Sequence, residues 1–298
     1  MMPRNMWGPA ASALLAVSLS IIAPATGANA RQAAGASLIG AGAGHYTVTV
    51  GGVGMTMFTY RPANCGKPDL LLVFHGVGHN ADGYRDHARW LADRLCMLVV
   101  APLFDKERFP AWRYQGGGIV DHGVVQPSNA WTGNVILGIV DWVRRTEGRN
   151  LDYYLLGHSA GGQFLSRVAA FVPTEAKRIV IANPSTYVFP SLTKAPYGFG
   201  GVYSANDSAA ELRCYLALPI TIFLGQEDTG DEERNDSPAA VAQGVTRYDR
   251  GRNAYRAARD LARSRGWAFN WRLVELPGVG HSARKMFATG EAAAALRR

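Results

Sequence analysis

Short apolar runs alternate with longer segments of helical periodicity along most of the chain. The runs that we expect to form buried strands are 70–74, 97–101, 153–156, 179–182, 220–224 and 271–276. Apolar residues recur at helical spacing in the segments 82–95, 129–145, 160–171, 252–265 and from about 283 onwards. Strands that alternate with helices predict an α/β fold, with a mostly parallel central sheet and helices on both faces.

The part of the chain before this alternation follows a different pattern. Residues 46–50 and 55–60 are β-type runs on either side of a Gly-rich turn, which predicts an N-terminal β-hairpin. Residues 31–44 are rich in Ala and Gly, and we expect a flexible linker there. Residues 184–217 are irregular and fall between two predicted strands. We expect them to form a lid-like insertion in a single domain over 45–298.

The first residues have the composition of a targeting segment. Arg4 precedes an apolar stretch at about 14–23, and the Ala-Asn-Ala sequence that ends at Ala30 has the small-x-small pattern of a cleavage site. These features predict a signal peptide over 1–30, cut after Ala30, and therefore a secreted or periplasmic protein. An uncleaved anchor is the alternative, although the apolar stretch is short for a bilayer span.

The chain has only three cysteines, which excludes a disulfide-framework miniprotein and a multi-Cys zinc fold. Outside the cytoplasm these thiols can be oxidised. Cys65 precedes one predicted strand and Cys96 precedes the next, so the two could meet at the same edge of the sheet. The number is odd, so at most one internal bridge forms, and Cys214 remains free if Cys65 and Cys96 pair.

Composition and charge narrow the class of protein further. The 298 residues are 48% hydrophobic and 18% charged, with a net charge of +8. The apolar share excludes a disordered chain, and the charge favours acidic partners or surfaces. Four arginines recur at helical spacing: Arg252, Arg256, Arg259 and Arg263. This stripe is either a solvated helix face or a contact surface for an anionic polymer or membrane. We expect no nucleic-acid partner.

One motif has the clearest chemical meaning. The sequence Gly-His-Ser-Ala-Gly at 157–161 lies between a predicted strand and a predicted helix. A serine at such a sharp turn projects its hydroxyl, and the flanking glycines permit the strained backbone. The N-terminus of the following helix favours developing negative charge. Ser159 is therefore the candidate nucleophile.

A serine hydroxyl needs a base that is oriented by a carboxylate. His281 follows the last predicted strand in a Gly-flanked loop and is the candidate base. Asp228 follows the strand at 220–224 and is the candidate acid. Other carboxylates near Asp228 would replace it if the strand ended elsewhere: Glu227, Asp231 and Glu232.

The chain order Ser159, Asp228, His281, with each residue after a strand, resembles the α/β-hydrolase superfamily from about residue 46 to the C-terminal helix. The sequence His-Gly-Val-Gly at 75–78 is similar to the family's His-Gly loop. The resemblance implies that the backbone N–H groups of Val77 (or Gly76) and Ala160 hold an oxyanion. Within the superfamily the chain looks like secreted esterases of the polyhydroxybutyrate-depolymerase and feruloyl-esterase kind.

These features predict a serine hydrolase that cleaves carboxylic esters, including polyesters or hydroxyacyl esters, through an acyl-enzyme and without a cofactor. His75 and His79 span a loop without a third ligand, so we expect no metal. Three aromatic residues are candidates to line a substrate pocket: Trp112, Trp131 and Tyr187. Two alternatives remain open. One is an amidase, peptidase or polyamide depolymerase with the same triad, and the other is a non-catalytic binder of an anionic polymer.

Overall fold

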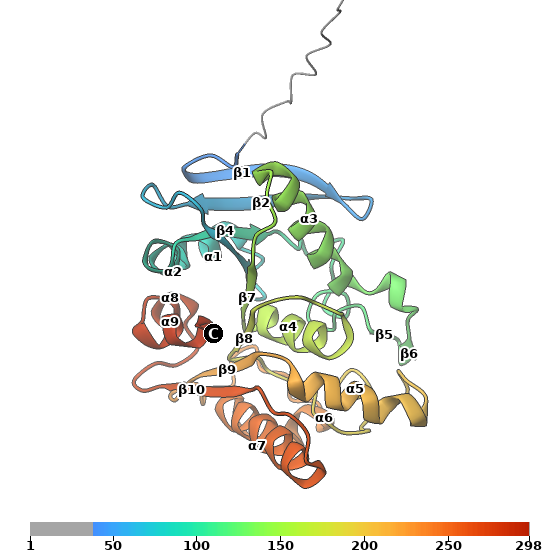
Figure 1. Ribbon diagram of the computed structural model, residues 1–298. Coiled ribbons are helices and arrows are strands. Elements are labelled where there is room, and N and C mark those ends of the chain that lie inside the picture. The colour runs from blue at the N-terminus through green and yellow to red at the C-terminus, as the bar shows by residue number, and fades with distance from the viewer. Residues whose placement is uncertain (1–37, 298) are drawn as a thin grey trace, which may run out of the picture. The chain divides into compact units, whose positions relative to one another are not determined.

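An eight-stranded sheet forms the centre of the computed structural model, which describes residues 38–297 (Figure 1). In spatial order its strands are β1 (Gly42–Val50), β2 (Val53–Arg61), β4 (Met97–Pro102), β3 (Asp69–Phe74), β7 (Tyr153–His158), β8 (Arg178–Ala182), β9 (Ile220–Gly225) and β10 (Arg272–Leu276). β2 pairs antiparallel with both of its neighbours, and the strands from β4 to β10 are parallel. The predicted sheet and N-terminal hairpin are confirmed.

Helices cover both faces of this sheet, as Figure 1 shows. One face carries α1 (Ala81–His87), α2 (Arg89–Leu95), α8 (Ala283–Phe287) and α9 (Gly290–Leu296). The other carries α3 (Val135–Glu147), α4 (Ala160–Phe171), α5 (Ala205–Ala217) and α7 (Arg247–Arg265). Because side chains of a strand alternate between the faces, the central strands are buried along almost their whole length. Their uninterrupted apolar runs reflect this two-sided burial.

Several elements differ from the predicted pattern. The segment predicted as one helix over 82–95 divides at Ala88 into α1 and α2. α5 lies within the insertion that was expected to be irregular; the Ser204 hydroxyl caps it by accepting a hydrogen bond from the Asp207 N–H. The small elements without a sequence signal are β5 (Val120–Asp121), β6 (Val124–Val125), η1 (Ser128–Ala130), η2 (Thr132–Asn134) and α6 (Pro238–Val241).

The N-terminal hairpin begins earlier than the sequence indicated. β1 starts at Gly42 and so includes the last residues of the expected linker. The predicted signal peptide and the rest of that linker lie outside the described residues. Within 38–297, no helix is both long and apolar enough to cross a membrane.

The order of the strands creates the place where a site can form. The chain passes from β3 to β4 on one side, and then returns across the sheet to β7 on the other side of β3. In an open α/β sheet the loops that follow two such strands separate and leave a crevice at their carboxyl ends. His75 follows β3, and Ser159 follows β7. The two loops singled out in the sequence therefore meet at this crevice.

A disulfide joins Cys65 to Cys96, whose Cα atoms lie 5.4 Å apart. Cys65 lies in the loop before β3, and Cys96 is the residue between α2 and β4. The disulfide therefore links the segments that precede the N-terminal ends of two adjacent parallel strands, β3 and β4, as the sequence suggested. Cys214 is a free, exposed thiol on α5.

We predict that replacing both Cys65 and Cys96 with Ala lowers the free energy of unfolding by about 3–4 kcal/mol, because the bridge closes a loop with a sequence separation of 31. Urea denaturation measures the change. Cys214→Ala is the matched control and should leave the midpoint unchanged. Equal midpoints for the double variant and the wild type would contradict the prediction.

Candidate active site

Ser159 occupies a strained turn between β7 and α4. Its φ of 58° and ψ of −117° lie outside the conformations that side chains other than glycine usually adopt. Glycines make the turn sterically feasible: a Cβ at Gly157 would collide with the Gly161 carbonyl oxygen, and one at Gly161 would collide with the Phe74 carbonyl oxygen. The serine hydroxyl is therefore fixed at the N-terminus of α4, as the motif predicted.

A chain of hydrogen bonds joins the three candidate residues. His281 Nε2 lies 3.0 Å from the Ser159 Oγ, and His281 Nδ1 lies 2.8 Å from an Asp228 carboxylate oxygen. With the Nδ1 proton donated to Asp228, Nε2 is free to accept the hydroxyl proton. The structure thus brings together Ser159, His281 and Asp228, rather than one of the neighbouring carboxylates.

Arg247, which the sequence analysis missed, binds the far side of this carboxylate. Its guanidinium lies 3.4 Å from the second Asp228 oxygen, and both side chains are 1% exposed. The same guanidinium donates to the carbonyl oxygens of Gly230 and Glu232 in the loop after β9. A buried carboxylate is costly unless it is paired, so Arg247 stabilises both its charge and its loop. The sequence analysis did not identify Arg247 because the predicted helix began at residue 252, whereas α7 begins at Arg247.

Asn183 ties the loops that carry Asp228 and His281 to the centre of the sheet. Its amide oxygen accepts from the Gly225 N–H, and its amide nitrogen donates to the Gly280 carbonyl oxygen. Gly225 precedes Asp228 at the end of β9, and Gly280 precedes His281. One buried side chain therefore sets the register of both loops, and an isolated Asn gave no signal in the sequence.

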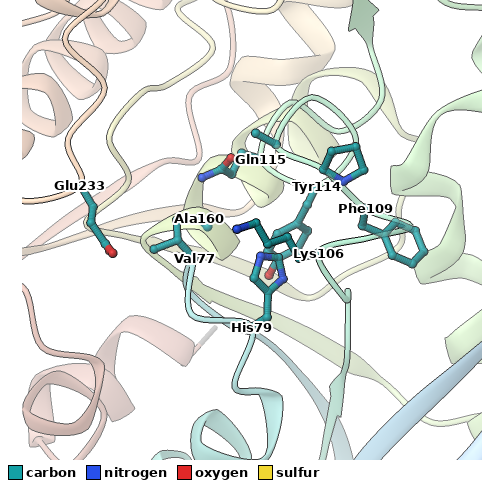
Figure 2. Close-up of a pocket in the computed structure, with 10 residues that line it drawn as sticks. Val77, His79, Lys106, Phe109, Tyr114, Gln115, Ala160 and Glu233 are labelled. Carbon is teal, nitrogen blue, oxygen red and sulfur yellow. The ribbon is translucent and has the colours of Figure 1, made fainter.

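The loop after β3 approaches the N-terminus of α4, as Figure 2 shows. Val77 and Ala160 line the same cavity, which we call the oxyanion-side cavity; its volume is about 420 Å³. Ala160 is the first residue of α4, and an N–H at that position has no partner within the helix. The arrangement leaves room for a negatively charged oxygen between this loop and the helix.

His75 holds the β3 loop in place. Its ring Nε2 accepts a hydrogen bond from the Phe104 N–H, so its Nδ1 carries the proton and donates to the Gly76 carbonyl oxygen at 2.8 Å. That carbonyl belongs to the peptide whose N–H is contributed by Val77. In a planar trans peptide the two groups point in opposite directions, so the His75 ring fixes the direction of the Val77 N–H. Burial lowers the pKa of His75 to about 4, and the ring is neutral at physiological pH.

His158 packs beside the triad rather than within it. Its ring centroid lies 4.6 Å from that of His281, and its Nδ1 lies 3.0 Å from the Tyr84 hydroxyl. Burial lowers the pKa of His158 well below its ordinary value, and the neighbouring His281 lowers it further. His158 therefore packs its ring against His281 and directs its Nδ1 to the Tyr84 hydroxyl rather than to Ser159.

Of the three aromatic candidates, Trp112 lines a cavity close to Ser159, together with Gln163 from the first turn of α4. Trp131 instead packs edge-on against Phe171, and its indole N–H donates to the Gln126 carbonyl oxygen. Tyr187 is 1% exposed and belongs to the hydrophobic core. Both were expected at the substrate pocket. Trp131 also lines two cavities, neither of which includes a triad residue, and the Tyr187 N–H donates to the Gln243 side-chain oxygen.

The arginine stripe lies on α7. Arg256, Arg259 and Arg263 are exposed, whereas Arg252 contacts Glu275 at 3.5 Å. Arg259 also pairs with Asp260 at 2.8 Å, which reduces the charge of the stripe.

Among residues 38–297, no group of three or more His, Cys, Asp or Glu is arranged to hold a metal ion. His79 Nδ1 instead lies 2.5 Å from the Phe104 carbonyl oxygen.

Family models and curated protein sequences give no match to the chain, but solved structures do. A poly(aspartic acid) hydrolase-1 from Sphingomonas sp. KT-1 is 33% identical, with a TM-score of 0.79 over 85% of this chain and 98% of that one. LpqC, a poly(3-hydroxybutyrate) depolymerase from Bordetella parapertussis, is 32% identical, with a TM-score of 0.78 over 85% and 90%. The chain belongs to the α/β-hydrolase superfamily.

The two similar structures just described are both hydrolases, and the protein is accordingly a hydrolase. An esterase from Pyrobaculum calidifontis shares 15% identity and a TM-score of 0.50 over 85% of each chain, a likeness that bears on the fold alone. The Sphingomonas and Bordetella proteins carry names for different polymers, one joined by amide bonds and the other by ester bonds. The substrate of this α/β-hydrolase therefore has to be argued from its own residues.

We predict that His75 makes the stability of the protein depend on pH. Its pKa is about 4 when folded and about 6.5 when unfolded, so the unfolded chain binds the proton first as the pH falls. The free energy of unfolding should decrease by about 2 kcal/mol more in the wild type than in His75→Asn between about pH 7 and pH 5. Urea denaturation at both pH values tests this. An equal decrease in the two proteins would show that His75 does not contribute.

Proposed function

We propose that the protein is a secreted serine hydrolase that cleaves carboxylic esters through an acyl-enzyme. The observation that carries this proposal is the hydrogen-bonded chain from the Ser159 hydroxyl through His281 to Asp228. A serine in a strained turn at a helix N-terminus, an imidazole within hydrogen-bond distance and a buried, paired carboxylate are the three parts that nucleophilic catalysis by an alcohol requires.

In the proposed reaction the Ser159 Oγ attacks the ester carbonyl carbon while His281 Nε2 accepts its proton. The carbonyl oxygen becomes an oxyanion, which the backbone N–H groups of Val77 and Ala160 stabilise. His281 then gives the proton to the leaving alcohol, and an acyl-enzyme remains. Water, deprotonated by the same imidazole, releases the acid and restores the serine.

Asp228 acts through His281 rather than on the substrate. It keeps the Nδ1 proton of His281 in place and stabilises the imidazolium that forms during each step. Arg247 positions Asp228 and keeps its second oxygen from turning towards His281. His75 positions the Val77 N–H through the Gly76 carbonyl. No step requires a cofactor.

Polyesters and hydroxyacyl esters are the proposed substrates. The cavity that contains Ser159 and His281 adjoins the oxyanion-side cavity, because Val77 and Glu233 line both, and a substrate longer than the reacting ester could occupy the two. The similarity to the Bordetella poly(3-hydroxybutyrate) depolymerase supports an ester polymer.

A polyamide is the second candidate substrate. The supporting observation is the similarity to the Sphingomonas poly(aspartic acid) hydrolase, over nearly the whole of that chain. Esters and amides share the acyl-enzyme route, and they differ in the leaving group that His281 must protonate.

Secretion rests on the predicted signal peptide over 1–30 and is supported by the bridge between Cys65 and Cys96. Structural disulfides persist in oxidising compartments and are rare in the cytosol. The N-terminal sequence of the exported protein, which should begin at Arg31, tests the proposed cleavage after Ala30.

We predict that Ser159→Ala and His281→Ala each lower kcat by about 10⁴-fold or more, because either change removes the proton transfer that activates the nucleophile. Asp228→Asn should lower kcat by a comparable factor. Asp231→Asn, at an exposed position of the same loop, is the control and should retain wild-type kcat. Steady-state hydrolysis of p-nitrophenyl butyrate measures all four, with circular dichroism to verify folding.

A covalent probe gives an independent test of the nucleophile. A fluorophosphonate should label Ser159 in the wild type and leave Ser159→Ala unlabelled. Label on another residue, or full turnover by Ser159→Ala, would refute the acyl-enzyme proposal.

We also predict faster cleavage of esters than of matched amides, because resonance stabilises an amide carbonyl more than an ester carbonyl, and an amide nitrogen must be protonated before it can leave. A p-nitrophenyl ester and the p-nitroanilide of the same acid provide the comparison, and a poly(3-hydroxybutyrate) film and soluble poly(aspartic acid) extend it to polymers. Release of soluble fragments from poly(aspartic acid) but not from the polyester would favour the polyamide candidate instead.

A further inference from the structure

Arg167 is a buried cation that the proposed reaction does not use. It lies on α4, two helical turns after Ser159, and the whole residue is 2% exposed. Among residues 38–297, no carboxylate lies within ion-pair distance of its guanidinium, whereas the equally buried Arg247 and Arg250 contact Asp228 and Asp236. Arginine is seldom buried unless it is paired, so this residue requires an explanation.

The Arg167 guanidinium donates hydrogen bonds to uncharged oxygen atoms. One terminal nitrogen donates to the carbonyl oxygens of Gln163 and Thr186, at 3.2 and 2.8 Å. The other donates to the Thr186 hydroxyl at 2.9 Å, and Nε has no partner in the described part of the chain. The guanidinium carbon lies 5.9 Å from the centre of the Tyr197 ring. These contacts orient the group and leave its positive charge without a counter-charge.

The charge persists at physiological pH. Burial lowers the pKa of Arg167 to about 10, which still leaves the guanidinium protonated near neutrality. An uncompensated charge away from water is costly and attracts an anion strongly, because the surroundings screen it weakly.

Arg167 also lines a cavity of about 430 Å³, which we call the Arg167 cavity. Gln163, Thr186 and Tyr197 line it with Arg167. It shares Ala111, Gln115 and Glu233 with the oxyanion-side cavity, so the two adjoin. Its second arginine, Arg234, is already paired with Asp236 at 2.7 Å.

The position of the guanidinium along α4 sets its distance from the chemistry. Gln163, whose carbonyl oxygen it contacts, follows Ser159 by about one helical turn, and the Gln163 N–H donates to the Ser159 carbonyl oxygen. The side chain of a helical residue points back towards the helix N-terminus. The Gln163 carbonyl that the guanidinium contacts therefore belongs to a residue about 6 Å beyond Ser159, measured along the helix axis.

We infer that the Arg167 cavity is a subsite for a carboxylate of the substrate, a few bonds from the carbonyl that Ser159 attacks. The inference rests on the proposed function, since it assigns the substrate class of the same site. Two kinds of substrate provide this chemistry: a chain with carboxylates along its length, and an oligomer of a hydroxyacid, which ends in one carboxylate.

Glu233 does not exclude an anion from this cavity. It is an exposed side chain at the junction of the cavities, where water screens its charge, whereas Arg167 is removed from water. A carboxylate that reaches the guanidinium gains a charge-assisted hydrogen bond in a weakly screened environment.

The test compares p-nitrophenyl monoesters of dicarboxylic acids, from glutaric to suberic acid, with the same esters whose free carboxyl is methylated. We expect the wild type to prefer the charged ester in kcat/KM by about tenfold or more at the best chain length. Arg167→Gln should lose most of this preference, and Arg167→Lys should keep part of it. Arg178→Gln is the matched control, because Arg178 is a buried arginine at the start of β8 with an Nε that also lacks a partner. It should keep the wild-type preference.

Opposite results would overturn the inference. If the wild type showed no preference for the charged ester at any chain length, the inference would be wrong. This measurement uses the wild-type protein alone and does not depend on whether a variant folds. Equal losses on charged and methylated esters in Arg167→Gln would overturn the inference as well, because they would show that Arg167 only braces the segment around Thr186. Failure of the proposed function has a different signature, namely hydrolysis that continues in Ser159→Ala.

Two further substrate pairs separate the sources of the carboxylate. An aspartyl oligomer with free or methylated side chains tests a polymer with acidic groups along it. A hydroxybutyrate oligomer with a free or methylated terminus tests an end group. A preference for the free acid that depends on Arg167 in either pair supports the subsite and names its source, and its absence in both pairs overturns it.

Discussion

The close approach of α4 to the strands β3 and β7 is the contact on which the rest of the site depends. Gly157 and Gly161 permit it, because any Cβ there would meet a backbone carbonyl. The approach forces Ser159 into its strained backbone conformation and sets the start of α4 beside the loop after β3. Both the direction of the hydroxyl and the position of the Ala160 N–H follow from this single packing arrangement. Strain of this kind persists only where the surrounding structure holds it.

The buried charged groups near this helix are of two kinds. Asp228 lies between Arg247 and His281, so its charge has partners within the protein. Arg167 has hydrogen-bond acceptors but no described acidic partner, and it lies at the wall of a cavity. The paired charges keep their geometry whether or not substrate is bound. The unpaired charge gains its partner only when an anion enters, which is the behaviour expected of a recognition residue.

The sequence contained enough information to predict the fold and the three joined side chains. Two-sided burial leaves uninterrupted apolar strands, and the residues that follow such strands must meet at one edge of the sheet, so Ser159, Asp228 and His281 could be chosen from position alone. Supporting residues could not be found in this way. Arg247 and Asn183 act through contacts with residues that are distant in the sequence, and no local pattern marks them. Trp131 and Tyr187 show the converse difficulty, because an aromatic residue in a loop has the same sequence signal whether it lines a pocket or fills the core.

Sequence identity and structural similarity to known proteins do not identify the substrate of this hydrolase. The Sphingomonas and Bordetella proteins differ by one percentage point in identity to this chain and by 0.01 in TM-score, yet they are named for a polyamide and a polyester. What distinguishes such polymers physically is the charge they carry near the scissile bond, and only a few side chains can sense it. The Ser159 hydroxyl, the oxyanion-side N–H groups and His281 meet the atoms common to both bonds. Arg167 contacts none of these atoms. Because it is charged, buried and lines a cavity that adjoins the oxyanion-side cavity, it has the properties needed to discriminate between an acidic and a neutral chain.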